Sequence, residues 1–334
     1  MYFPVAFEKD VLMTPKRIHF RQNEYVLWKS RKGIVCMPNR CPHRNARLSD
    51  GRVILQSKLE CPYHGWQFNP NGKCVKIPQL KEGTKIPKAC NLKDVNLKVY
   101  DEIVWISPYM NGIFKELEMF KQNPNYYVTD YFLDAPYSYE LQIENLLDPA
   151  HLHFVHDGFQ GNRKRASEIF LDKFYENDNE IYGYFTHANE ETPDIEIKFC
   201  KPAMVVVAIY DKKTKSLLRK NIIYVSPKEK NTSNVLFRDV AIKEFLVPQD
   251  SFFLKFHGNL LINGPAKGFV EDHYQFINMQ VIDKIMEQDL DILKGQQENI
   301  VDYKNAKYVM PAPCDRLIIA FRNWIIKQPY SETV

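Results

Sequence analysis

Two short segments near the start of the chain each offer one thiol and one imidazole. They read Cys41-Pro42-His43-Arg44 and Cys61-Pro62-Tyr63-His64-Gly65-Trp66, and 17 residues separate His43 from Cys61. Two thiolates and two imidazoles suit a two-iron cluster in which the cysteines bind one iron and the histidines bind the other. A tetrahedral zinc site is the alternative, because Cys2His2 sets also bind zinc. The small and aromatic residues around the ligand pairs favour the [2Fe-2S] cluster.

A third segment places three histidines within six residues, in the run Asp148-Pro149-Ala150-His151-Leu152-His153-Phe154-Val155-His156. A non-haem Fe(II) that binds oxygen needs two imidazoles and one carboxylate, with positions left open for O2 and substrate. His151 and His156 are about 140° apart on an ideal helix, so a helix must be distorted there, and Pro149 can cause that distortion. His153 lies about 200° from His151 and is expected to be a structural or pocket residue.

The carboxylate of such a site must come from elsewhere in the chain. A predicted helix over residues 270–300 carries several candidates: Asp283, Glu287, Asp289, Asp291 and Glu298. A charge run on a helix is usually a solvated face, and that interpretation applies to most of these residues.

The elements that position these residues change in character near Pro108. Short β-rich runs separated by Gly, Asn, Asp and Pro predict a small antiparallel β domain over residues 1–108, and longer elements predict an α+β domain over 109–334. The predicted strands are 18–20, 25–28, 34–37, 53–55, 104–106, 137–141, 195–199, 204–210, 221–225, 235–237 and 252–256, and the predicted helices are 270–300 and 315–327.

Composition excludes several classes of protein. The chain has 334 residues, of which 26% are charged and 45% hydrophobic, which rules out disordered and fibrous proteins. No apolar run approaches the roughly 18 residues of a membrane span, and no secretory signal is visible. The odd number of cysteines, 7, does not form a disulfide framework and fits a reducing compartment. We therefore expect a soluble, cytoplasmic protein that binds no nucleic acid.

The net charge of +4 conceals two different halves. Residues 1–110 contain 19 Lys and Arg against 9 Asp and Glu, about +10, and the remainder contains 26 against 32, about −6.

The two motifs in this order resemble the α subunit of a Rieske non-haem iron oxygenase. The resemblance is greatest to the branch that contains pheophorbide a oxygenase and cyanobacterial hydroxylases of saxitoxin-type natural products, and it covers nearly the whole chain. It implies an N-terminal all-β Rieske domain followed by a helix-grip catalytic domain, which is an antiparallel sheet with helices. It also implies His151, His156 and Asp289 as ligands of a mononuclear Fe(II), and it places Asn145 near the iron. Asp148 would link a ligand histidine to the Rieske histidine of a neighbouring subunit.

The resemblance further implies an oxygenase component of a homotrimer. Such a protein uses O2 and electrons from NAD(P)H, delivered by a separate ferredoxin or flavin reductase. It hydroxylates or oxidatively demethylates a small cyclic substrate, such as a natural product or a pigment-type molecule. The alternative is a two-domain Rieske electron carrier without oxygenase activity. A carrier would hold about two irons per chain, and the oxygenase about three.

Overall fold

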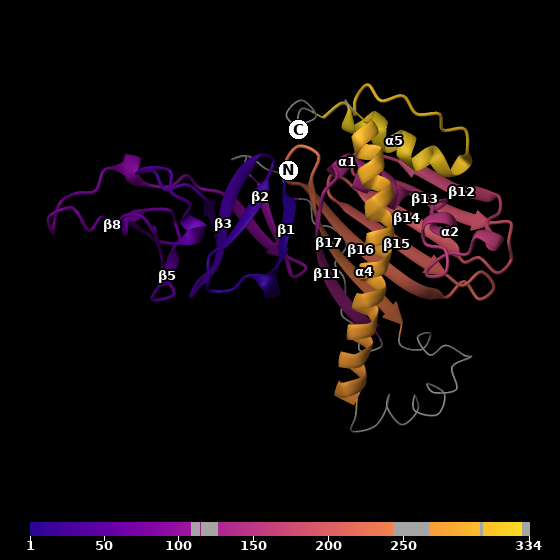
Figure 1. Ribbon diagram of the computed structural model, residues 1–334, viewed down its shortest axis with the longest axis horizontal. Helices are drawn as coiled ribbons and strands as arrows, with labels where there is room; N and C mark the ends of the chain where they lie inside the picture. The colour runs from indigo at the N-terminus through magenta and orange to yellow at the C-terminus, as the bar shows by residue number, and fades with distance from the viewer. Residues whose placement is uncertain (108–113, 115–125, 243–266, 301–302, 329–334) are drawn as a thin grey trace. The chain divides into compact units, whose positions relative to one another are not determined.

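The computed structural model describes residues 1–107, 114, 126–242, 267–300 and 303–328, without the side chains of 267–277 (Figure 1). The chain forms two compact units. The first consists of Met1–Met119 with Ser226–Lys230, and the second of Phe120–Val225 with Asn231–Val334. The predicted domain boundary at residue 108 lies outside the described residues.

The first unit consists of small sheets, ordered β1-β10-β9, β2-β3-β4 and β5-β6-β7-β8, and its strand pairs are antiparallel. Tight turns make this possible. Arg21 and Gln22, between β2 and β3, both have positive φ angles, 47° and 60°, as a type I′ turn requires. The strands are β1 Phe3–Phe7, β2 Lys16–Phe20, β3 Asn23–Ser30, β4 Gly33–Pro38, β5 Arg52–Ile54, β6 Lys58–Glu60, β7 Gln67–Phe68, β8 Cys74–Lys76, β9 Asn96–Tyr100 and β10 Ile103–Ser107.

The second unit is built on a seven-stranded sheet in the order β11-β17-β16-β15-β14-β13-β12. The strands are β11 Tyr126–Ala135, β12 Ile169–Glu176, β13 Glu180–His187, β14 Asp194–Cys200, β15 Met204–Tyr210, β16 Leu217–Pro227 and β17 Ser233–Ile242. The helices are α1 Tyr139–Leu147, α2 Leu152–Val155, α4 Lys267–Asn299 and α5 Arg316–Ile325. The long helix α4 runs across one face of the sheet (Figure 1).

The structure confirms the predicted fold class, with one wrong element. Residues 137–141, predicted as a strand, contain the start of α1, because the Oγ atom of Ser138 caps the helix by accepting a hydrogen bond from the Leu141 backbone N–H. The alternating apolar residues that suggested a strand are explained by burial of the helix on almost every side, from Tyr139 to Glu144. The predicted strand 252–256 lies outside the described residues.

No helix among the described residues is long and apolar enough to cross a membrane.

Candidate metal centres

The histidine-rich segment is a broken helix, as the spacing predicted. Helix α1 ends at Leu147, and Asp148 has an extended backbone with φ −97° and ψ 109°. Proline disfavours helical backbone at the residue before it, which explains the break at Asp148. The Asp148 carboxylate accepts a hydrogen bond of 2.7 Å from the backbone N–H of Ala150, and the short helix α2 follows. His151 and His156 therefore flank a single turn of helix.

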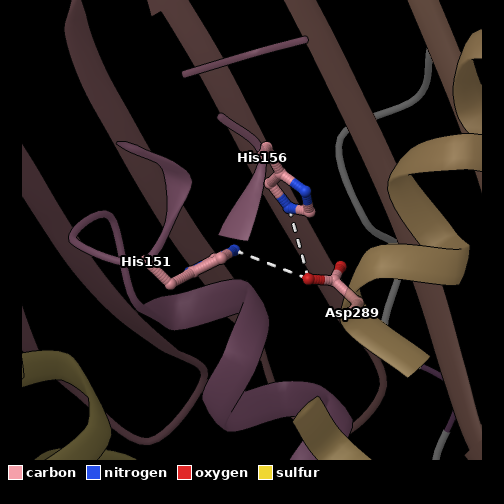
Figure 2. Close-up of side chains that lie close together, drawn as sticks. All are labelled: His151, His156 and Asp289. Atoms are coloured by element: carbon pink, nitrogen blue, oxygen red, sulfur yellow. Dashed lines mark ion pairs between the residues drawn. The ribbon is translucent and has the colours of Figure 1, made fainter. Parts of the chain in front are cut away.

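The break brings both histidines to Asp289 on α4 (Figure 2). The Nε2 atom of His156 lies 3.2 Å from Oδ1 of Asp289, and Nε2 of His151 lies 4.0 Å from the same oxygen. All three ligand atoms lie within 4.8 Å of one another. Two atoms about 2.1 Å from one ion are about 3 Å apart at a right angle and about 4 Å apart at wide angles. The distances of 3.2 and 4.0 Å between Asp289 and the two histidines therefore suit a shared metal ion.

Burial singles out Asp289 among the acidic candidates on α4. Its side chain is 8% exposed, whereas the other four candidates, Asp283, Glu287, Asp291 and Glu298, are exposed. Those four form the solvated face of the helix.

The Nδ1 atom of each histidine faces a side-chain oxygen, and that of His156 lies within hydrogen-bonding distance of it. Nδ1 of His156 lies 3.1 Å from Oε1 of Gln288, and Nδ1 of His151 lies 3.6 Å from Oδ2 of Asp148. Metal-binding histidines commonly direct the second ring N–H to such an oxygen, which leaves the other nitrogen free to bind metal. Gln288 has no predicted role from the sequence, although its position next to Asp289 on α4 is a signal that points to it.

The charges and lone pairs of this cluster fit a cation. If the Nδ1 proton of His156 points to Gln288, the Nε2 lone pair faces a carboxylate oxygen, and a cation between them relieves that repulsion. Among the described residues, Oδ1 of Asp289 is buried with no hydrogen-bond partner. Burial opposes protonation of His151, but the carboxylates of Asp148 and Asp289 outweigh it and raise the pKa of the imidazole. Two imidazoles and a carboxylate are also the donor set of non-haem Fe(II).

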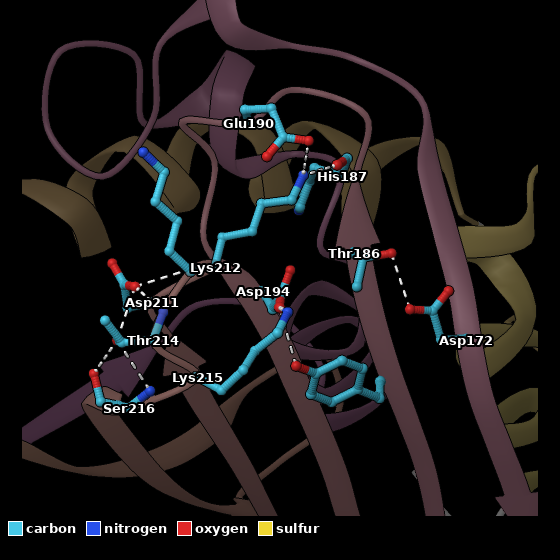
Figure 3. A network of polar contacts seen from close by, with 12 residues as sticks. Asp172, Thr186, His187, Glu190, Asp194, Asp211, Lys212, Thr214, Lys215 and Ser216 are labelled. Carbon is cyan, nitrogen blue, oxygen red and sulfur yellow. Dashed lines mark hydrogen bonds and ion pairs between the residues drawn. The ribbon is translucent and has the colours of Figure 1, made fainter.

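His153 points elsewhere. Its Nδ1 atom accepts a hydrogen bond of 3.1 Å from the backbone N–H of Asn162, and its ring packs edge-on against His187 at 5.8 Å between centroids. Gly161 permits the chain to pass close to the backbone of α2, because a Cβ atom there would lie 2.0 Å from the backbone oxygen of Leu152. His187 belongs to a polar region with Lys212 and Glu190 (Figure 3). The structure thus gives His153 a packing role.

His151, His156 and Asp289 line a cavity of about 80 Å³, and most of the other side chains that line it are apolar. Asn145 and Asp148 also line it. The sheet supplies one wall, and α4 supplies Ile282, Ile285 and Met286 opposite. An apolar cavity with a few polar groups is the usual form of a small-molecule site.

In the first unit, the two cysteine-containing loops have the same backbone structure. The N–H of Cys41 donates to Ala46 and that of Cys61 donates to Trp66, at 2.9 and 2.8 Å. Four residues after each cysteine, Asn45 and Gly65 donate back to the cysteine carbonyl with φ angles of 59° and 70°. Asn and Gly are the residues that adopt this left-handed conformation most readily.

These loops carry the four candidate donors of a Rieske cluster: two thiols and two imidazoles. The thiols of Cys41 and Cys61 are buried, at 1% and 2% exposed, and burial raises the pKa of Cys41 to about 12. The rings of His43 and His64 lie outside this core, 4.5 Å apart between centroids, and His43 stacks on Trp66. Two buried sulfurs and two adjacent, more exposed imidazoles fit a cluster with one iron on each pair.

Comparison with known proteins gives the family of each domain. Residues 1–101 match the Rieske [2Fe-2S] domain family, and residues 136–238 match the vanillate O-demethylase oxygenase C-terminal domain family. A Rieske domain followed by an oxygenase C-terminal domain defines the class of the protein. The chain therefore consists of a Rieske [2Fe-2S] domain followed by an oxygenase C-terminal domain, and it is homologous to the pheophorbide a oxygenase family and to bacterial Rieske oxygenases.

Among curated relatives, pheophorbide a oxygenase of Oryza sativa subsp. japonica is 25% identical over 98% of this chain and 64% of its own length. Protein TIC 55 of Arabidopsis thaliana is 37% identical over 51% of this chain and 33% of its own length. The chain thus spans a third to two thirds of these relatives. NdmB of Pseudomonas putida CBB5 has a similar fold, with a TM-score of 0.74 and 22% identity over 97% of this chain and 88% of NdmB. Dicamba monooxygenase also has a similar fold, with a TM-score of 0.71 and 18% identity over 98% of this chain and 96% of the monooxygenase chain.

The relatives correct one expectation from the sequence. Pheophorbide a oxygenase and protein TIC 55 are chloroplastic, so the predicted cytoplasmic location is wrong. The prediction rested on unpaired cysteines and the lack of a long apolar run. Those features fit any reducing compartment and could not separate cytoplasm from chloroplast.

Proposed function

We propose that the chain is the oxygenase component of a multicomponent system that hydroxylates or oxidatively demethylates a small cyclic substrate. The observation that carries this proposal is the convergence of His151, His156 and Asp289 at an otherwise mainly apolar cavity. These residues would hold the mononuclear Fe(II), and Cys41, Cys61, His43 and His64 would hold the [2Fe-2S] cluster.

When bound, the cluster would supply single electrons and the mononuclear iron would activate O2. The residues of the chain prepare that chemistry. Asp148 and Gln288 fix the two histidine rings, and the apolar wall excludes water and holds the hydrocarbon part of a substrate. Asn145 lies on the same wall as Asp148 and contacts what enters the cavity.

The proposed substrate is a ring-containing natural product or pigment-type molecule. The apolar lining supports this class, and so do relatives named for pheophorbide a and for flavonoid 8-hydroxylation. Electrons would come from NAD(P)H through a separate ferredoxin or flavin reductase. The excess of basic residues in 1–110 favours an acidic donor protein and predicts salt-sensitive association.

We also propose a homotrimer in which the Rieske domain of one protomer serves the mononuclear site of the next, with Asp148 between the two centres. A head-to-tail interface that closes produces such a ring. The opposite charges of the two halves, about +10 and −6, support contact between protomers.

The test measures iron content and oxygen uptake. Purified protein should contain about three irons per chain, and a set of polycyclic and guanidinium compounds should include one that stimulates O2 uptake with product formation. About two irons per chain, with a Rieske spectrum and no stimulated uptake, would instead identify an electron carrier. The buried triad in the second unit speaks against the carrier, because an interaction module has no need of it.

A further inference from the structure

A second polar group lies on the sheet wall of the cavity, away from the histidines in sequence. Arg219, Asn221 and Ile223 alternate along β16, so their side chains share one face of the sheet. All three line the cavity that the metal triad reaches. The neighbouring strands place apolar residues around them: Ile195, Ile197, Val207, Ile209 and Phe237.

This polar group is anchored on Asp239 of β17, which is fully buried. The Asp239 carboxylate accepts hydrogen bonds from Nε of Arg219 at 2.5 Å, from Nδ2 of Asn221 at 2.7 Å and from Nδ2 of Asn278 at 2.8 Å. The guanidinium group compensates the charge of the carboxylate. This end of the cavity is therefore polar but neutral.

The anchor fixes the orientation of the Asn221 amide. Because a carboxylate oxygen only accepts hydrogen bonds, the Asn221 atom that faces Asp239 must be Nδ2. Asn278 is already engaged, since its Oδ1 accepts from Arg219 and its Nδ2 donates to Thr129 and Asp239. Among the described residues, the Asn221 side chain makes one hydrogen bond, and an amide has capacity for more.

We propose that Asn221 is the specificity-determining polar contact of the substrate site, and that it binds a neutral hydrogen-bond acceptor such as a ring carbonyl. This inference rests on the proposed function and adds the chemical class of the group that is recognised. A carbonyl oxygen that accepts a hydrogen bond from the second Nδ2 proton leaves the rest of the ring system against the isoleucines and Phe237. A carboxylate is disfavoured beside Asn221, because Asp239 already balances the charge of Arg219 and the Asn221 amide carries no charge of its own.

The experiment compares three probes of similar size by calorimetric titration of the purified, iron-loaded chain. Acetophenone carries a neutral carbonyl, ethylbenzene lacks it and benzoate is an anion. Acetophenone should bind about 3- to 10-fold more tightly than ethylbenzene, as one neutral hydrogen bond provides, and benzoate should bind more weakly than acetophenone. Asn221→Leu should remove the preference for acetophenone. Asn221→Thr, whose hydroxyl can still donate to Asp239, should do the same with less disturbance of the anchor.

Gln160→Leu is the matched control, because Gln160 is another amide that lines the cavity. It should keep the preference for acetophenone. Equal affinity for acetophenone and ethylbenzene, tighter binding of benzoate, binding of none of the probes, or loss of the preference only in the Gln160 variant would each overturn the inference. The titration requires neither a reductase nor O2, so its failure is distinct from failure of the proposed oxygenase function.

Discussion

Nε2 of His156 lies 3.2 Å from Oδ1 of Asp289, although one residue follows the short helix α2 and the other lies on the long helix α4. This pair joins the two halves of the candidate iron site.

Replacing Asp289 should remove the mononuclear iron alone. We expect Asp289→Ala to fall from about three irons per chain to about two and to lose product formation, while the Rieske visible and EPR spectra persist. His151→Ala and His156→Ala should behave in the same way. His153→Ala is the control and should keep its iron, because His153 contacts Asn162 and His187 instead. If Asp289→Ala turned over normally, Asp283 or Asp291 would become the candidate carboxylate ligand.

Gln288 should tune iron affinity without binding iron. Gln288→Leu removes the acceptor for Nδ1 of His156, and loss of such an orienting group typically weakens metal binding about 10- to 100-fold. Competition with a chelator measures the change. Glu287→Gln, an exposed neighbour on α4, is the matched control. Equal affinity of both variants would remove Gln288 from the site.

Replacing His64 should affect the other centre. His64→Ala should abolish the Rieske visible and EPR signals and leave the mononuclear iron in place. The control is Tyr63→Phe, which alters an exposed neighbour but no proposed ligand. If purified His64→Ala kept the signals, another residue would have to bind that iron.

Asp148→Asn should separate assembly from activity. The variant should keep both metals and the trimer yet lose most of its turnover, because the proposed link between the centres of neighbouring protomers is interrupted. Mixing a His64→Ala protomer with an Asp289→Ala protomer should restore some activity in mixed trimers. Full activity of a monomer, measured by light scattering under assay conditions, would contradict transfer between subunits.

His187 should make stability depend on pH. Burial, assisted by His153 and Lys212, lowers its pKa to about 4, whereas the unfolded chain binds the proton near 6.5. Between these values the unfolded state holds more protons, so stability falls as pH decreases from about 6.5 to 4, by up to about 1.4 kcal/mol per pH unit. His187→Phe should flatten this slope in urea titrations at several pH values. A slope unchanged from that of the parent chain would assign the effect to other groups.

The sequence predicted most of this site because its ligands are clustered. The four proposed Rieske donors lie in two short loops, and the break before Pro149 explains how His151 and His156 could share a metal. The choice of Asp289 among five acidic residues depended on the resemblance to a known family, because the spacing of charges on a helix does not reveal which face is buried. Asn221, Asp239 and Asn278 come from three elements that meet only in the folded unit, so no local pattern could connect them. The strand prediction at 137–141 failed because alternating apolar residues also occur in a helix buried on all sides.

The separation of the proposed iron ligands along the chain would link metal loading to synthesis. His151 and His156 precede the six strands β12 to β17, and Asp289 follows them. The ribosome therefore synthesises every strand of the sheet before it synthesises Asp289. An iron ion could not find its full set of proposed donors on a shorter chain. Once bound, the ion closes a long loop and opposes its reopening, as a metal clip does. Loss of iron should thus remove a constraint on the folded second unit as well as the reactive metal itself.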